Sequence, residues 1–286
     1  MSGEVLLARD ELGEGEYRSS PELGVALIAR ADAPPKSVTY SNVNGLAIVE
    51  GDIVLGRVAE LEGAMRVARG ADDTGLIAFG VGIVGSRFRW PDMRMPFEID
   101  PALPNASRVA DAIAHWEENT PFRFPTRSGS DDNYVRFIDD GGCSSYVGMQ
   151  GGRQEISLSA GCSVGNAIHE IGHAVGLWHE QSREDRDLFV TINWENIQAG
   201  RASQFNQHIS DGNDIGPYCY DSIMHYGRFA FSGNGRETIT PVDPNAQIGQ
   251  RNGLAPCDIA TVLAMYPASP TSQEWLEPIL HVMMTS

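Results

Sequence analysis

The sequence predicts an α+β fold, in which short strands and a few helices precede a long region of loops and turns. Two segments combine alternating apolar residues with high strand propensity, and others carry apolar residues at helical spacing. After Gly176 the sequence is mostly turn-forming. The predicted strands are 134–138 and 155–158, and the predicted helices are 105–118, a segment around His169, and 257–265.

Residues 1–80 differ from the rest of the chain and are predicted to form a separate N-terminal segment. Its first part, 1–17, is acidic and carries no clear periodicity. Residues 46–56 contain short apolar pieces on both sides of a Gly51-Asp52 turn. The small-residue stretch 80–85 is predicted to be a hinge that a protease can reach.

The first elements after this hinge are predicted to be strands that contain Phe88, Trp90 and residues 95–99. They are followed by the helix predicted at 105–118, where apolar residues at spacings of three and four form one face. Asn105 is the predicted N-cap of that helix, since its short polar side chain can accept from a first-turn amide.

Three histidines in the segment 169–179, HEIGHAVGLWH, have the spacing of a catalytic zinc site. On a helix, His169 and His173 lie one turn apart and project from the same face. Gly176 can adopt a positive φ and end the helix, which turns the chain so that His179 reaches the same ion. Three imidazoles and a water form the open tetrahedral shell typical of catalytic Zn²⁺.

Glu170, next to the first predicted ligand, is predicted to be the general base. Two histidines four residues apart are common on helices. Five fixed residues within eleven arise by chance in only about one in several million windows, so the motif is specific. Ser163 or Asn166 is the predicted cap of the helix that carries it.

This motif and the sequence that follows it resemble the astacin-type zinc endopeptidases of the metzincin group. The downstream turn, 222–226, reads SIMHY, and residues 179–187, HEQSREDRD, resemble the astacin signature. Residues 143–148, CSSYVG, resemble the edge-strand region of that family. The resemblance runs from about Val81 to Pro267. It implies a metzincin-like catalytic domain, with a twisted, mostly antiparallel-edged sheet and two long helices in the upper half, and an irregular lower half with a C-terminal helix.

The resemblance also implies roles for three residues beyond the histidines. Tyr226 would be a further zinc ligand that moves away to stabilise the oxyanion of the transition state. Met224 would form an apolar floor beneath the zinc. Glu180 would contact the new N-terminus formed near Val81, and the alternative for Glu180 is a solvated carboxylate at the end of a helix.

A latent form is also implied by the resemblance. Asp52 would then bind the zinc in place of water and block catalysis, with Val49 at the position where the family usually has phenylalanine. The alternative is an ordinary surface turn. The resulting organisation is a propeptide-like segment at 1–80, an astacin-like catalytic domain at 81–268, and a C-terminal tail at 269–286.

Four cysteines permit two disulfide bonds in three possible pairings. The resemblance implies a bridge between Cys143 and Cys162, which leaves Cys219 and Cys257 to connect the 222–226 turn to the C-terminal helix. This second pair departs from the usual second bridge of the family, because Pro121 stands where the family places a cysteine. Four reduced thiols in a cytosolic protein are the alternative.

The charge balance limits the classes of partner. There are 21 basic and 38 acidic residues, a net charge of −17, so nucleic acids and anionic membranes would be repelled. No apolar run approaches the roughly 20 residues that span a membrane. These features favour a secreted monomer. However, the first ten residues lack the basic start and apolar core of a secretory signal, so a signal outside this chain, a special export route and a cytoplasmic location remain open.

We therefore predict a zinc-dependent endopeptidase that hydrolyses internal peptide bonds through metal-activated water and is made as a latent zymogen. A protein or peptide substrate would add as an extra strand to an edge near residues 145–148. One alternative is a zinc-binding module without proteolytic activity, although Glu170 is present. Another is an enzyme of the same type that acts inside a cell, or after special export, on one host protein.

Overall fold

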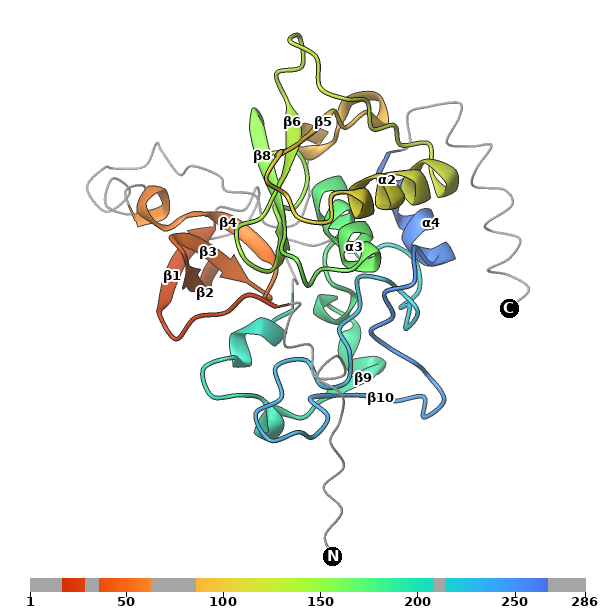
Figure 1. Cartoon of the computed structure of the whole chain (residues 1–286). Helices are drawn as coiled ribbons and strands as arrows, with labels where there is room; N and C mark the ends of the chain where they lie inside the picture. Colours follow the sequence, from red (N-terminus) through yellow and green to blue (C-terminus); the bar gives the residue numbers. More distant parts are fainter. Residues whose placement is uncertain (1–16, 29–35, 63–85, 208–213, 267–286) are drawn as a thin grey trace, which may run out of the picture.

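The computed structural model describes residues 17–28, 36–62, 86–207 and 214–266. The predictions for the first 16 residues, the hinge at 80–85 and the tail at 269–286 lie outside the described residues. Figure 1 shows the N-terminal strands at one end of a central sheet, on the left of the view, and the main helices on the right.

The central sheet has eight strands in the order β1-β2-β3-β4-β7-β8-β6-β5. The strands β1 to β4 form an antiparallel meander, and β4 then pairs with β7 in parallel through Ile53 and Ser145. Beyond it, β7 is antiparallel to β8, while β8, β6 and β5 are parallel. The bounds are β1 (Leu23–Ile28), β2 (Lys36–Val43), β3 (Leu46–Val49), β4 (Ile53–Arg57), β5 (Phe97–Ile99), β6 (Tyr134–Ile138), β7 (Cys143–Ser145) and β8 (Arg153–Leu158).

The predicted α+β fold is confirmed, as are the strands predicted at 134–138 and 155–158. The strands predicted at Phe88 and Trp90 are wrong, because these residues lie in or next to the short 3-10 helices Ser86–Phe88 and Pro91–Met93. Pro91 has no N–H to donate to a sheet. Both aromatic side chains are nonetheless buried, and Nε1 of Trp90 donates to the carbonyl of Ala174 at 2.8 Å.

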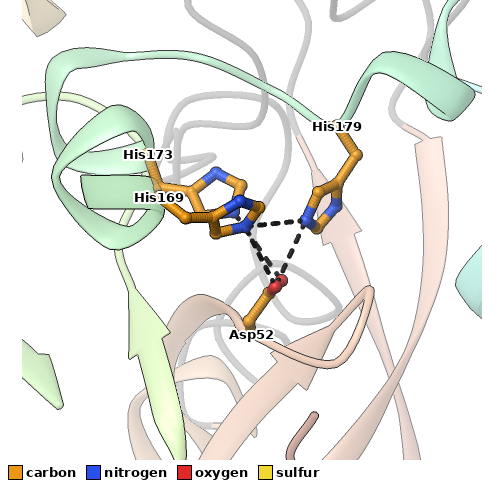
Figure 2. Close-up of side chains that lie close together, drawn as sticks. All are labelled: Asp52, His169, His173 and His179. Carbon is orange, nitrogen blue, oxygen red and sulfur yellow. Dashed lines mark hydrogen bonds and ion pairs between the residues drawn. The ribbon is translucent and has the colours of Figure 1, made fainter. Parts of the chain in front are cut away.

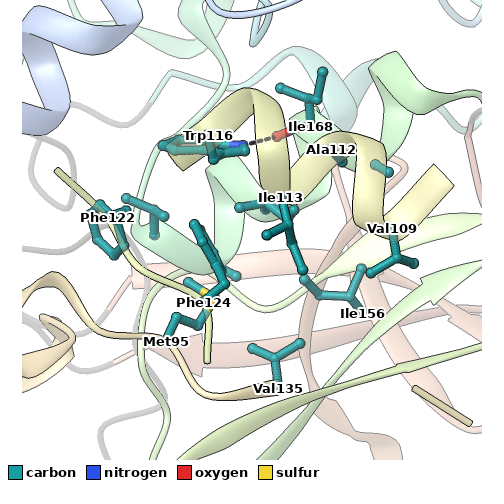
Figure 3. Packing of buried hydrophobic residues seen from close by; sticks show 14 of the residues in the cluster. Met95, Val109, Ala112, Ile113, Trp116, Phe122, Phe124, Val135, Ile156 and Ile168 are labelled. Carbon is teal, nitrogen blue, oxygen red and sulfur yellow. Dashed lines mark hydrogen bonds between the residues drawn. The ribbon is translucent and has the colours of Figure 1, made fainter. Parts of the chain in front are cut away.

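Two helices, α2 (Ser107–Asn119) and α3 (Val164–Val175), pack against each other and against the sheet. Figure 3 shows the apolar core between them, in which Nε1 of Trp116 donates to the carbonyl of Ile168 at 3.1 Å. The N-cap predicted at Asn105 is wrong. Asn105 has φ of 51°, and the amides of the first turn of α2 donate to backbone carbonyls of residues 105 and 106 instead of to a side chain.

Both predicted ends of α3 are confirmed. Ser163 Oγ accepts from the amide of Asn166 at 3.1 Å, and Asn166 Oδ1 accepts from the amide of Ser163 at 2.9 Å, which is a capping box. At the other end Gly176 has φ of 125° and donates to the carbonyls of Gly172 and His173. A side chain would strain this conformation, so glycine fits the point where the chain turns away from the helix axis.

The lower half of the molecule is irregular, with a small sheet of β9 (Val190–Ile192) and β10 (Ile239–Pro241) and the C-terminal helix α4 (Pro256–Met265). Both predicted disulfide bonds are present, Cys143–Cys162 and Cys219–Cys257. The first connects β7 to the chain that enters α3, and the second connects the segment before the 222–226 turn to α4. Within the described ranges, every helix is too short or too polar to cross a bilayer.

Candidate active site

Three imidazoles and one carboxylate meet in a fully buried cluster between α3 and the turn from β3 to β4. His169 and His173 come from α3, His179 follows the turn at Gly176, and Asp52 comes from the N-terminal segment (Figure 2). Oδ2 of Asp52 lies 3.3 Å from Nε2 of His169 and 3.2 Å from Nε2 of His179, and Oδ1 lies 3.7 Å from Nε2 of His173. Four of the five ligands predicted from the sequence are thus brought together, and Tyr226 is the fifth.

The turn that carries Asp52 depends on an unusual backbone. Glu50 and Gly51 have φ of 49° and 78°, so two successive residues are in the left-handed region. A Cβ on Gly51 would lie 2.7 Å from the ring of Phe231 and 2.8 Å from that of Tyr17. Glycine therefore lets the turn enter between these rings and deliver the aspartate.

Hydrogen bonds orient all three imidazoles. Nδ1 of His169 donates to the carbonyl of Ile223 at 2.8 Å, and Nδ1 of His173 donates to the carbonyl of Leu177 at 2.8 Å. Nδ1 of His179 faces the carboxylate of Glu50 at 2.7 Å. With the proton on Nδ1, each ring directs the lone pair of Nε2 into the cluster, which is the arrangement that metal-binding histidines adopt.

This donor set fits a zinc ion. Nε2 of His169 and Nε2 of His179 lie 3.3 Å apart, and Nε2 of His173 and Oδ1 of Asp52 make no hydrogen bond within the described part of the chain. Buried electron-rich atoms at such distances need a cation or a proton between them. Imidazole nitrogen and carboxylate oxygen are ligands that zinc accepts in a tetrahedral shell.

The protonation states agree with a metal site. Burial holds the pKa of both His169 and His173 well below 6.5, so these two rings are neutral at neutral pH. Burial alone also lowers the pKa of His179, but Asp52 and Glu50 outweigh it and raise that pKa to about 9. Without a metal, His179 therefore carries a second ring proton at neutral pH. A cation at the same place would displace it.

Glu50 is a site residue that sequence reasoning missed. Its buried carboxylate accepts from Nδ1 of His179 and, at 2.9 Å, from the hydroxyl of Ser182. Its backbone carbonyl accepts from the hydroxyl of Tyr226. The one available signal was that Glu50 lies in the same turn as Asp52, two residues earlier. No local pattern indicates that Glu50 contacts His179, which is 129 residues away.

The other predicted site residues surround the cluster. Glu170 is fully buried on α3 next to His169. Tyr226 is also fully buried, and its ring centroid lies 4.6 Å from that of His179. Met224 packs against α3, because a Cβ on Gly172 would lie 2.8 Å from its Sδ. Direct participation of these residues in metal binding or catalysis stays a prediction.

Glu180 is mostly buried and accepts from the amide of Cys219 at 2.8 Å. Burial, only partly opposed by Arg183, raises the pKa of Glu180 to about 8. The partner predicted for this carboxylate, a new N-terminus near residue 81, lies outside the described residues.

The strand predicted to receive substrate is an interior strand in this chain. The amide of Ser145, at the end of β7, donates to the carbonyl of Asp52 at 2.9 Å, and β4 pairs with β7 at the next residue. The amide of Gly148 donates to the carbonyl of His173 at 2.8 Å. The N-terminal segment therefore lies along the edge that was predicted to be open.

The family model of the astacin peptidases matches residues 83–267. Zinc metalloproteinase nas-13 of Caenorhabditis elegans is 42% identical over 183 residues, which cover 62% of this chain and 41% of that protein. High choriolytic enzyme 1 of Oryzias latipes is 44% identical over 163 residues, which cover 55% of this chain and 59% of that protein. The chain thus spans only part of the length of these relatives.

A solved structure extends the comparison to three dimensions. The structure of high choriolytic enzyme 1, a hatching enzyme zinc-protease from Oryzias latipes, superposes with a TM-score of 0.58 at 35% sequence identity. The match covers 70% of this chain and 100% of that one.

Proposed function

Because this chain belongs to the astacin family of zinc metalloendopeptidases, we propose that it hydrolyses internal peptide bonds of proteins or peptides and that the full chain is a latent zymogen. The observation that carries both parts is the cluster of His169, His173 and His179 around the carboxylate of Asp52. The three imidazoles suit a catalytic zinc site, and the carboxylate of Asp52 is placed where it would inhibit that site.

In this proposal the three histidines hold one zinc ion. When bound, zinc supplies the Lewis acidity that activates water and polarises a carbonyl group. The carboxylate of Glu170 takes the proton of the attacking water and later delivers it to the leaving amine. The hydroxyl of Tyr226 donates to the oxyanion that develops on the substrate carbonyl.

Latency is supported by three contacts of residues 50–53 with three parts of this machinery. The carboxylate of Asp52 occupies the space among the Nε2 atoms that the attacking water needs. The carbonyl of Glu50 takes the hydroxyl of Tyr226. Strand β4 pairs with β7, where an extended substrate would add. One segment therefore blocks the water, the oxyanion donor and the substrate backbone together.

We further propose that the boundaries are those expected from the sequence, with a propeptide at 1–80, a catalytic domain at 81–268 and a tail at 269–286. Cleavage near Val81 would release the inhibitory turn and supply an α-amino group for Glu180. The two disulfide bonds support an oxidising, extracellular location. The net charge of −17 supports a protein that stays monomeric through self-repulsion.

The test is hydrolysis of casein by the full-length chain before and after limited treatment with elastase, which cuts after small apolar residues such as those of 80–85. We expect activity to rise as a fragment that begins near Val81 accumulates, and a zinc chelator to abolish it reversibly. Glu170→Ala, processed in the same way, is expected to bind zinc and to stay inactive. A processed wild-type protein that binds zinc but cleaves nothing across a broad peptide library would contradict the proposal and favour the non-catalytic module.

A further inference from the structure

Arg18, in the N-terminal segment, inserts its guanidinium into a polar pocket beside the proposed active site. Only 2% of its side chain is exposed, although charged side chains are rarely buried to this degree. Nη1 donates to Oγ of Ser144 at 2.7 Å. Nη2 donates to the carbonyl of Asp140 at 2.7 Å and to its Oδ2 at 3.2 Å. We name the surface formed by Asp140, Gly142 and Ser144 the Arg18 pocket.

The Arg18 pocket is shaped for a long basic side chain. Gly142 has φ of 83°, and a Cβ there would lie 2.6 Å from Cγ of Arg18. The missing side chain thus leaves room for the alkyl stem, while three oxygens meet the planar head. This set of acceptors suits the forked donors of arginine better than lysine, which presents a single ammonium.

The pocket lies where an extended substrate would pass. Ser144 precedes Ser145, whose amide donates to the carbonyl of Asp52 at 2.9 Å. The amide of Arg18 in turn donates to the carbonyl of Gly51 at 2.5 Å. Ser144, in the wall of the pocket, is therefore the neighbour along β7 of the residue that contacts the metal-binding turn, with a rise of roughly 3.3 Å between the two.

The walls of the pocket do not belong to the N-terminal segment. Asp140, Gly142 and Ser144 all lie within the residues that match the astacin family model, so removal of residues 1–80 would empty the pocket and leave it intact. Asp140 also lines an adjoining cavity of about 510 Å³. The charged residues of that cavity are four carboxylates and one guanidinium, Asp100, Asp139, Asp140, Glu155 and Arg136. This balance attracts cations to the region.

We propose that the Arg18 pocket is a substrate subsite, which makes the processed enzyme prefer arginine, and lysine less strongly, at one position close to the scissile bond. Arg18 occupies this subsite in the latent chain in the place of a substrate side chain. The proposal rests on the proposed endopeptidase function and adds the chemical class of the substrate. It predicts recognition of basic peptides by a protein whose own net charge is −17.

The first test is cleavage of peptides randomised on both sides of the scissile bond by the processed enzyme. At one position we expect kcat/KM for arginine to exceed that for its neutral isostere citrulline by at least about tenfold. Asp140→Lys should remove this preference by lowering kcat/KM for the arginine peptide toward that for the citrulline peptide. Asp111→Lys, the same charge change on the exposed face of α2, should keep the preference. No basic preference, or a preference unchanged in Asp140→Lys, would overturn the proposal.

A binding measurement separates this proposal from the proposed function. Processed Glu170→Ala is titrated by calorimetry with the arginine peptide and with the citrulline peptide, in the wild-type and Asp140→Lys backgrounds. We expect about tenfold tighter binding of the arginine peptide, lost with Asp140→Lys. Equal binding of the two peptides would overturn the subsite even if proteolysis is observed. A difference in binding would support it even if the wild type cleaved nothing.

Discussion

Oε2 of Glu50 lies 2.7 Å from Nδ1 of His179, in a pair that is fully buried. The corresponding nitrogens of His169 and His173 donate to backbone carbonyls within the residues that match the family model. His179 alone therefore depends on the N-terminal segment for its orienting partner. Loss of that segment leaves two histidines fixed and requires the third to find a new acceptor.

We predict that Glu50→Gln weakens latency. An amide oxygen is a weaker acceptor than a carboxylate for Nδ1 of His179 and for Ser182, and hydrogen bonds to charged groups contribute about 1.5–3 kcal/mol. The unprocessed variant should hydrolyse casein measurably, at a rate between those of the latent and processed wild type. After processing, variant and wild type should be equal, because residue 50 is then gone. A silent unprocessed variant would argue against a role for Glu50 in latency.

Asp52→Ala should have a larger effect, because it removes the carboxylate that lies among the three Nε2 atoms. The full-length variant is expected to exceed the full-length wild type by at least about tenfold in casein hydrolysis, since water can then reach the metal position. The double variant Asp52→Ala, Glu170→Ala is the control and should be inactive. If the full-length Asp52→Ala protein is inactive but becomes active on processing, another contact maintains latency.

The two disulfide bonds should differ in their contribution to stability. The sequence separations are 19 residues for Cys143–Cys162 and 38 for Cys219–Cys257. Loop-closure entropy then gives about 3 kcal/mol for the first and about 4 kcal/mol for the second. Urea unfolding of each double Cys→Ser variant measures the loss of free energy. A loss below about 1 kcal/mol for either variant would show that the unfolded chain is not restrained in this way.

Stability at mildly acidic pH should depend on His115. Its Nε2 accepts from the amide of Leu254 at 2.9 Å, and burial, partly opposed by Glu118, lowers the pKa of His115 below 6.5. The folded state thus binds this proton less readily than the unfolded state. The contribution to stability is complete above the unfolded pKa of about 6.5 and is lost as the pH falls from there through the lower folded pKa.

The measurement is the free energy of unfolding by urea between about pH 7 and pH 5. His115→Gln keeps a hydrogen-bond acceptor but does not titrate, so its stability should fall less steeply than that of the wild type over this range. The other histidines of the chain are present in both proteins, so their contribution to the pH dependence is the same in both and cancels in the comparison. Parallel pH profiles would exclude His115 as the source.

The sequence was most informative about features that depend on residues close to one another in the chain. The spacing of His169 and His173, the cap at Ser163 and the stop at Gly176 are local features, and the structure contains each of them. Local patterns also misled. The apolar pair Phe88 and Trp90 resembles strand alternation, yet these side chains reach the core from a turn that Pro91 shapes.

Contacts between distant parts of the chain were harder to predict. The expectation that Asp52 lies at the histidines came from a family resemblance. No local pattern marks Glu50 or Arg18, because their partners, His179 and Ser144, are 129 and 126 residues away. Burial of these charged groups depends on how the N-terminal segment lies on the rest of the chain, which periodicity and propensity do not describe.

The pairing of β4 with β7 also affects solubility. Among the described residues the end strands of the sheet are β1 and β5, and β7 lies between two neighbours. Any cut that releases the first four strands turns β7 into an outer strand whose backbone groups face solvent, and such strands promote association between copies of a protein. The full-length chain is thus the form suited to storage at high concentration, while the cut form is best kept dilute or occupied by a ligand.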